Sequence, residues 1–283
     1  MNDLKMKLLS YQRKPFSFLM LVLIYFAAAI TVAVMLFIVA YILIKGIPHL
    51  TPELFALEYN SKNVSMMPAI INTLLMTFLT LLIAVPIGVF SAVYLVEYAK
   101  RGSRLIRVIR VTTETLAGIP SIVYGLFGFL AFVIALGWSY SLLAGALTLA
   151  IMVLPTIIRT TEEALLAVPD AYREGSFGLG AGKLRTVFKI IVPAAIPGIL
   201  AGVILAIGRI VGETAALIFT AGTVADVPNS LFASARTLAV HMYCLLSEGL
   251  YTDQAYATAV VLLVTVVIIN GLSNRVAKRL TKH

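Results

Sequence analysis

The chain has 283 residues, of which 60% are hydrophobic and 12% charged, and its mean hydropathy is +1.00. Soluble domains are far less apolar, so this composition excludes them and predicts a protein with several membrane-spanning helices. The net charge of +9 does not indicate nucleic-acid binding, because the basic residues lie beside apolar runs rather than along one helix face. A single cysteine, Cys244, excludes an internal disulfide, and three scattered histidines indicate no histidine-rich metal site. We expect no cofactor.

Six apolar runs are long enough to cross a bilayer as helices. In chain order they cover residues 16–45, 69–96, 111–136, 139–158, 194–220 and 256–273. The first is too long for the apolar part of a signal peptide, so we expect it to be a retained span. Pro86, Pro120 and Pro155 lie inside runs and predict kinks. The fold class expected is therefore an all-α polytopic membrane protein with six transmembrane helices.

Basic residues mark the side of the membrane on which each connection lies. They are concentrated in the N-terminal tail, at residues 100–110 and at the C-terminus, and the positive-inside rule places such segments in the cytoplasm. The segment 159–193 then lies on the cytoplasmic side too, whereas the connections 46–68 and 221–255 lie outside. Both termini are expected in the cytoplasm, and the chain is expected in the lipid of a cell membrane.

The fifth run, which contains AIGRIVGETAALIF, carries two charges, Arg209 and Glu213, four residues apart. Each charge costs about 2.5–3.5 kcal/mol at the centre of a spanning helix, and residues four apart are neighbours on one helix face. One interpretation is an internal ion pair that serves only packing. The interpretation that we favour is a polar lining, in which the planar guanidinium of Arg209 attracts an anion on its way through. Glu213 would then weaken the attraction and accept a hydrogen bond from an anion that carries a hydroxyl group.

Two other polar positions leave alternatives open. Glu114, near the cytoplasmic end of the third run, would either line the inner gate, or else snorkel to the interface or pair with Arg110 one turn earlier, and we favour the second alternative, in either form. In the last outer connection, Arg236 and His241 would either meet a docking protein or be packed. A lone histidine beside apolar residues is more often packed, so we favour packing for His241.

The cytoplasmic segment reads TEEALLAVPDAYREGSFGLGAGKLRTVFKIIVP over residues 161–193. It predicts a helix, a glycine turn and a short amphipathic helix with an apolar face formed by Leu184, Val187, Phe188 and Ile191. A phosphate-binding loop, G-x-x-x-x-G-K-[ST], would need glycine at Phe177 and Ser or Thr at Leu184. The match fails twice, so we expect no nucleotide site and no enzymatic activity in this chain. Any ATP-driven work must come from another subunit.

The same segment resembles the cytoplasmic signature of the permeases of ATP-binding-cassette importers: E-A-A, three residues, G, nine residues, I-x-L-P. The matching positions are Glu174, Gly175, Ser176, Gly180, Ile190, Val192 and Pro193. Gly175 and Ser176 replace the two alanines, and Val192 replaces leucine. The resemblance implies that this segment docks on an ATPase subunit. Gly180 would be needed either for a positive φ or for close approach of the partner's backbone.

Three more stretches resemble the permeases of phosphate importers: TLAGIPSIVYGLFGF (115–129), GRIVGETAAL (208–217) and SARTLAVHMYCL (234–245). Ala216 stands where proline is expected. The resemblance covers about residues 70–275 and implies a permease core at 69–283, preceded by a tail, first helix and outer loop at 1–68. It further implies alternating access together with a second homologous permease, two ATP-binding-cassette subunits and an extracytoplasmic phosphate-binding protein.

Other functions stay open at this point. The nearest keeps the architecture and carries another oxyanion, such as phosphonate, molybdate or sulfate. A proton-coupled secondary transporter would use Glu114 and Glu213 as relay carboxylates. An intramembrane hydrolase is disfavoured, because no serine or cysteine has an evident base on an adjacent turn. The signature at 174–193 favours an importer over the secondary transporter and the hydrolase, since neither of these two needs a dock for an ATPase.

Overall fold

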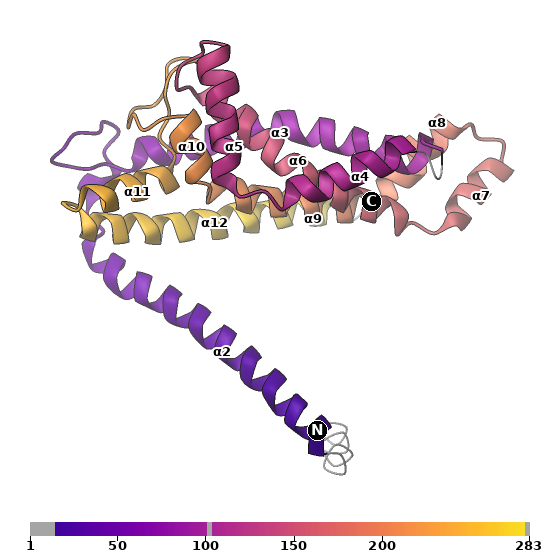
Figure 1. The fold of residues 1–283 in the computed structure, drawn as a ribbon, viewed down its shortest axis with the longest axis horizontal. Helices are drawn as coiled ribbons and strands as arrows, with labels where there is room; N and C mark the ends of the chain where they lie inside the picture. Colours follow the sequence, from indigo (N-terminus) through magenta and orange to yellow (C-terminus); the bar gives the residue numbers. More distant parts are fainter. Residues whose placement is uncertain (1–14, 101–103, 281–283) are drawn as a thin grey trace.

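The computed structural model describes residues 15–100 and 104–280, which form helices joined by turns and loops without a strand (Figure 1). The long helices are α2 (Pro15–Gly46), α3 (Met67–Val93), α6 (Leu142–Leu166), α9 (Val192–Val211) and α12 (Thr252–Leu280). The shorter helices are α4 (Arg104–Ala117), α5 (Ser121–Gly128), α7 (Asp170–Gly178), α8 (Lys183–Thr186), α10 (Ala215–Thr220) and α11 (Leu238–Glu248). Two 3₁₀ turns, η1 (Ile47–His49) and η2 (Pro52–Phe55), follow α2. Three π-helical turns are η3 (Tyr94–Tyr98), η4 (Phe129–Ala135) and η5 (Val187–Ile191).

Five continuous helical segments of the described chain are long and apolar enough to cross a membrane. They cover Phe16–His49, Met67–Tyr98, Leu142–Leu166, Lys183–Val211 and Thr252–Arg279. A sixth span results when the bent pair Ile106–Ala117 and Ser121–Ala135 is taken as one. The expected six spans and the all-helical class are confirmed in this sense.

The third expected span, 111–136, is wrong as a single helix. Its two halves, α4 and α5, meet at an angle of 104°. The N–H groups of Gly118 and Ile119 donate to carbonyls three residues earlier, which closes α4 in a tight turn. Pro120 then has ψ 141° and caps α5, and the residue before a proline avoids helical angles. Pro86 and Pro155, by contrast, lie inside α3 and α6.

The fifth expected span, 194–220, is wrong at both ends. Its helix begins earlier, because α8, η5 and α9 continue into one another from Lys183 to Val211. The short amphipathic helix expected in the cytoplasmic segment is therefore the start of this span. At the other end α9 stops at Val211, and the separate helix α10 begins at Ala215.

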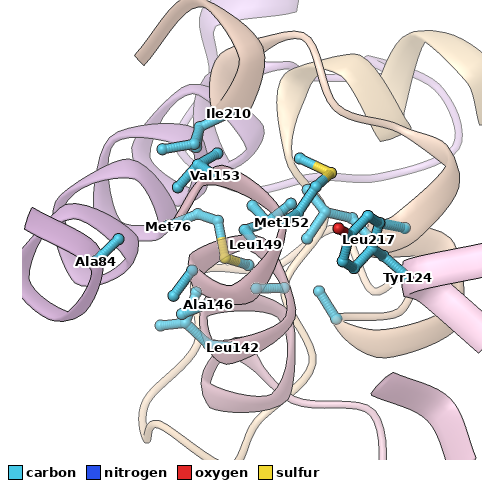
Figure 2. Close-up of a cluster of buried hydrophobic side chains, with 14 of the residues drawn as sticks. Met76, Ala84, Tyr124, Leu142, Ala146, Leu149, Met152, Val153, Ile210 and Leu217 are labelled. Carbon is cyan, nitrogen blue, oxygen red and sulfur yellow. The ribbon is translucent and has the colours of Figure 1, made fainter. Parts of the chain in front are cut away.

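The core is built around α6, which lies between α3 and α9. Figure 2 shows Met76 of α3 against Leu149 and Met152 of α6, with Ile210 and Leu217 nearby. Small residues let the helices approach closely, as is common between membrane helices. A Cβ on Gly202 of α9 would lie 1.9 Å from Oγ1 of Thr160, and a Cβ on Gly88 of α3 would lie 2.6 Å from Cγ2 of Ile157.

Helix α2 leaves this bundle at an angle and touches it only near its C-terminal end (Figure 1). There, a Cβ on Gly46 would lie 2.3 Å from the carbonyl oxygen of Tyr256, and the rings of Tyr41 and Tyr256 meet edge to face. His49 Nε2 lies 3.6 Å from Asp253 Oδ2. The remaining side chains of α2 are almost all exposed, although the helix is strongly apolar.

The bundle has two distinct ends. Figure 1 shows α10 and α11 at one end, together with the turn after α2, and α7 and α8 at the other. We call these the α11 end and the α7 end. Helix α5 stands crosswise to the long helices and packs against α10.

Candidate functional site

The break between α9 and α10 contains the two charges that sequence analysis singled out. Glu213 lies outside both helices, where its N–H donates to the carbonyl of Ile210 at 3.2 Å. Its Oε1 accepts a hydrogen bond from the N–H of Ala216 at 3.1 Å, and the residue is 8% exposed. The prediction that Arg209 and Glu213 share one face of a continuous helix is therefore wrong. The two residues form no ion pair, because the carboxylate instead caps the first turn of α10.

Ala216 explains why this cap exists. A proline at this position, which the resemblance led us to expect, would have no N–H to donate to Glu213. The alanine has this N–H, and the carboxylate accepts it. Glu213 is consequently held by the backbone of its own break and is not held by the guanidinium of Arg209.

Arg209 lies in the last turn of α9 and is partly buried. Among the described residues it has no hydrogen-bond or ion-pair partner, although it is close enough to Tyr124 of α5 to act on the phenol electrostatically. The Tyr124 hydroxyl donates to the carbonyl of Leu116 at the end of α4, at 2.8 Å. Arg209 thus lies where the break of α4 and α5 meets the break of α9 and α10.

The two breaks are packed tightly together. A Cβ on Gly125 of α5 would lie 2.8 Å from Cα of Ala216, and a Cβ on Gly128 would lie 2.1 Å from Oγ1 of Thr148 on α6. These contacts fix α5 against α10 and α6. The surroundings of Arg209 and Glu213 are therefore a rigid junction of helix ends.

Glu114 lies apart from this junction, on the exposed side of α4. It borders a cavity of about 220 Å³ between α4 and α6, together with Thr113 and Arg159. The pairing of Glu114 with Arg110 is wrong, because the Arg110 guanidinium pairs with Glu162 of α6 instead. Glu162 is the more buried acid of the cavity and so the better partner. Glu114 forms no ion pair with a described residue.

The glycine turn of the cytoplasmic segment has the conformation that sequence analysis named first. Gly180 has φ +80°, and a Cβ there would meet no atom within 4 Å. The N–H of Ala181 donates to the carbonyl of Ser176, and the N–H of Gly180 donates to the carbonyl of Phe177. These two bonds form the Schellman pattern at the end of α7. Positive φ, rather than close approach within this chain, is what requires glycine.

The remaining signature positions surround this turn. Glu174 and Gly175 are exposed on α7, whereas Ser176 is buried and its Oγ lies 2.8 Å from Oγ1 of Thr186 on α8. Serine in place of alanine thus ties α7 to α8. Ile190 lies in η5 and Pro193 in the first turn of α9.

The apolar face expected after the turn is only half correct. Val187 and Ile191 are buried against α3 and α6, but Leu184 and Phe188 are exposed. Leu179, at the tip of the turn, is 90% exposed. The segment consequently presents apolar side chains on its outer surface.

Sequence reasoning missed a polar contact at the α7 end. Arg173 of α7 lies against Glu97 of η3, with 2.7 Å between Nη2 and Oε1. The two residues are 76 positions apart, and no periodicity or spacing relates them.

At the α11 end, the packed interpretation of His241 agrees with its complete burial. The Arg236 Nε donates to the carbonyl of Thr223 at 2.6 Å, and its guanidinium lies 5.4 Å from the centre of the Tyr59 ring. Burial and the charge of Arg236 lower the pKa of His241 to about 4. His241 is therefore a neutral packing residue at pH 7.

Up to six apolar spans, two of them broken beside a buried carboxylate and a guanidinium without a partner among the described residues, are typical of a multi-pass membrane transport protein. Residues 84–282 match the family described as binding-protein-dependent transport system inner membrane component, and the chain belongs to this family. It is thus a permease of a binding-protein-dependent ATP-binding-cassette importer, located in the inner membrane.

Curated relatives are similar over most of the chain. The probable ABC transporter permease protein YqgI of Bacillus subtilis is 34% identical over 90% of this chain and 94% of its own length. The phosphate transport system permease protein PstA of Pasteurella multocida is 40% identical over 74% and 75%, respectively. PstA 1 of Mycobacterium tuberculosis is 37% identical over 71% and 67%.

Solved structures share the fold at low sequence identity. A bacterial alginate ABC transporter has a TM-score of 0.70 at 15% identity, covering 96% of this chain and 98% of that chain. The inward-facing methionine transporter MetNI has a TM-score of 0.60 at 22% identity, covering 76% and 93%. These likenesses confirm the type I importer permease fold, which carries different substrates in different proteins.

Proposed function

We propose that this permease carries inorganic phosphate. The observation that carries the proposal is Arg209, a partly buried guanidinium at the junction of two broken spans with no acidic partner among the described residues. An unpaired charge in an apolar run is costly unless it meets a partner or a wet pathway. The planar fork of arginine donors suits a tetrahedral oxyanion. The resemblance to the PstA permeases supports phosphate as this oxyanion.

Glu213 has a separate part in this proposal. Its Oε1 is engaged by the N–H of Ala216, so its second oxygen is left to accept the hydroxyl hydrogen of hydrogen phosphate. Sulfate has no such hydrogen at neutral pH. The negative charge also limits how long the anion stays at Arg209, as conduction requires. Glu114 would border the pathway at the α7 end.

The proposed assembly has a second homologous permease, two ATP-binding-cassette subunits and an extracytoplasmic phosphate-binding protein. The apolar surface of α2, which the bundle leaves exposed, supports a contact with the second permease within the membrane. The segment 161–193, with exposed Tyr172, Phe177 and Leu179, supports docking of an ATPase at the α7 end. Both chain termini would then lie in the cytoplasm, and residues 69–283 would form the permease core.

Alternating access provides the mechanism. ATP binding would draw the two ATPase subunits together, and the segment 161–193 would pass this movement to the spans. The pathway between the two permeases would then open outward to receive phosphate from the binding protein. Hydrolysis would return it to the inward-facing state.

The test is uptake of labelled phosphate by vesicles that contain the assembled complex. ATP is supplied on the side of the membrane that the ATPase subunits occupy. We expect Arg209→Gln to assemble normally and to lose uptake, and Arg209→Lys to keep part of it. The double variant Arg209→Gln with Glu213→Gln should assemble and stay inactive. Wild-type uptake by that double variant would overturn the anion pathway.

Competition separates the rival cargoes and the rival mechanism. Excess unlabelled phosphate should block uptake, whereas phosphonate, molybdate and sulfate should not. Uptake that persists without ATP and collapses with a protonophore would replace the importer by a proton-coupled transporter.

A further inference from the structure

The guanidinium of Arg173 joins three elements at the α7 end. Its Nε and Nη2 both donate to Glu97 Oε1 of η3, at 3.2 and 2.7 Å. Nη2 and Nη1 donate to the carbonyls of Leu165 and Val168, at 3.0 and 2.9 Å, where α6 ends. Nη1 also donates to Asp170 Oδ1 in the first turn of α7, at 3.0 Å. Arg173 itself belongs to α7, so one side chain holds α7 to the ends of two spans.

This arrangement uses the full donor capacity of arginine. The side chain has five N–H donors in a planar fork, and five contacts are made. Lysine has a compact ammonium with three donors and cannot reach the same set of acceptors. The Leu165 carbonyl also accepts the N–H of Val168 at 3.4 Å, so the guanidinium adds a second donor where α6 ends.

The Glu97 contact is protected from water, whereas the Asp170 contact is not. The side chain of Arg173 is 17% exposed and that of Glu97 is 9% exposed, but that of Asp170 is 73% exposed. A charged hydrogen bond is worth more when it is shielded, and an exposed ion pair contributes little. Glu97 is therefore the partner that matters.

Few other contacts hold α7. Ser176 is its only buried residue, and that side chain points to α8. A cavity of about 690 Å³ lies beside the link, bordered by Phe177 of α7 and Ile106 of α4. Lys183 of α8 lies 5.0 Å from the ring centre of Tyr98, but both residues are exposed. The helix is thus fixed to the ends of α3 and α6 by the polar contacts of Arg173, and to α8, where the fifth span begins, by Ser176.

We propose that Arg173 is a positioning residue that makes α7 and the ends of α3 and α6 move as one unit during transport. The inference depends on the proposed docking of an ATPase on this segment. A displacement of α7 by the ATPase pulls on Glu97 and on the end of α6 through the guanidinium. Because α3 and α6 pack closely along their length, both spans follow.

The experiment measures phosphate taken up per ATP hydrolysed by the full complex in vesicles. Arg173→Gln and Glu97→Gln should keep the ATPase subunits bound and lower this ratio about tenfold or more. Arg173→Lys should resemble Arg173→Gln, because charge alone does not rebuild the fork. A matched control, Asp170→Asn, removes only the exposed partner and should stay within about twofold of wild type. A wild-type ratio in an assembled Arg173→Gln complex would overturn the inference.

A covalent bridge covers the case in which the substitutions prevent assembly. Glu97→Cys with Arg173→Cys, in a Cys244→Ala background, places two thiols where the ion pair was. Closing them with a short bismaleimide before the ATPase subunits are added should restore assembly and bring the ratio to within about threefold of wild type, because a link rather than a charge is required. A bridged, assembled complex that hydrolyses ATP without transport would also overturn the inference.

The two proposals fail in different ways. A wild-type complex that moves no phosphate overturns the proposed cargo. The ratio measured with the oxyanion that the complex does move would still test Arg173.

Discussion

Gly180 allows a sharp test of the docking segment, because replacing it with a residue that has a Cβ carries a purely conformational cost. Its φ of +80° lies in the left-handed region, and a Cβ there would meet nothing within 4 Å. A residue with a Cβ pays about 1–2 kcal/mol for that conformation. The Gly180→Ala substitution therefore shifts the equilibrium between the native turn and rearranged turns by about 5- to 30-fold. No steric term adds to this value within the chain.

Gly178 is the matched control two positions earlier. It lies inside α7, and a Cβ there also meets nothing within 4 Å. Alanine is favoured over glycine in a helix by about 0.5–1 kcal/mol, so Gly178→Ala should be neutral or slightly stabilising. Gly180→Asn should lie between the two, since asparagine tolerates the left-handed region.

The assay is phosphate-stimulated ATP hydrolysis by the assembled complex, together with the amount of ATPase that copurifies with the permease. We expect Gly180→Ala and Gly180→Leu to lower one or both, while Gly178→Ala leaves them unchanged. If Gly180→Ala and Gly178→Ala behave alike, the turn does not hold the dock and the reasoning is refuted.

Three further outcomes are expected. Between pH 7 and pH 5 the protein should lose about 2 kcal/mol of stability, measured by thermal unfolding in detergent, and His241→Gln should flatten this dependence. The sign follows because Arg236 and burial lower the pKa of His241 to about 4, so the unfolded chain binds a proton that the native state lacks between pH 6.5 and 4. Glu213→Ala should lower the free energy of unfolding by about 1 kcal/mol, because it removes the cap of α10, whereas Arg209→Gln should not change it measurably. A loss of several kcal/mol in Arg209→Gln would indicate an ion pair with Glu213, contrary to the structure. For topology, an impermeant thiol reagent should label Lys62→Cys in intact cells and Arg279→Cys only after permeabilisation, and the reverse pattern would invert the orientation.

The spans could be predicted from hydropathy because the bilayer demands long apolar helices whatever their tertiary contacts. The breaks could be predicted only in part: the kink expected at Pro120 is confirmed, but the sequence did not distinguish Pro120 from Pro86 and Pro155, where the helices continue, and it did not predict the break after Val211. A helix may continue past a glycine or a proline when neighbours satisfy its freed groups, as α3 does at Pro86, or stop, as α4 does before Pro120. Whether the helix continues or stops at Pro120 depends on the packing of Tyr124 and Gly125 against the break between α9 and α10. No local sequence pattern predicts that packing.

The same limit applies to the charges. A spacing of four suggested that Arg209 and Glu213 were partners, but the rule holds only while one helix contains both residues. In the structure the Glu213 carboxylate accepts the N–H of Ala216 instead of pairing with Arg209. For Arg173 the sequence offered many acids, and only the folded chain selects Glu97. Gly180, by contrast, was predictable because its conformation is set by the turn itself.

The right-angled elbow between α4 and α5 bears on how the protein enters its membrane. Neither Ile106–Ala117 nor Ser121–Ala135 reaches the roughly 20 residues that a single crossing requires. The insertion machinery meets this stretch as one apolar run before α6, α9 or α10 has been made. We expect the run to enter the bilayer as one straighter helix and to bend when the later helices pack against it. Biogenesis of this third span is consequently a two-stage event, and defects in α10 should first appear as a failure of the elbow to close.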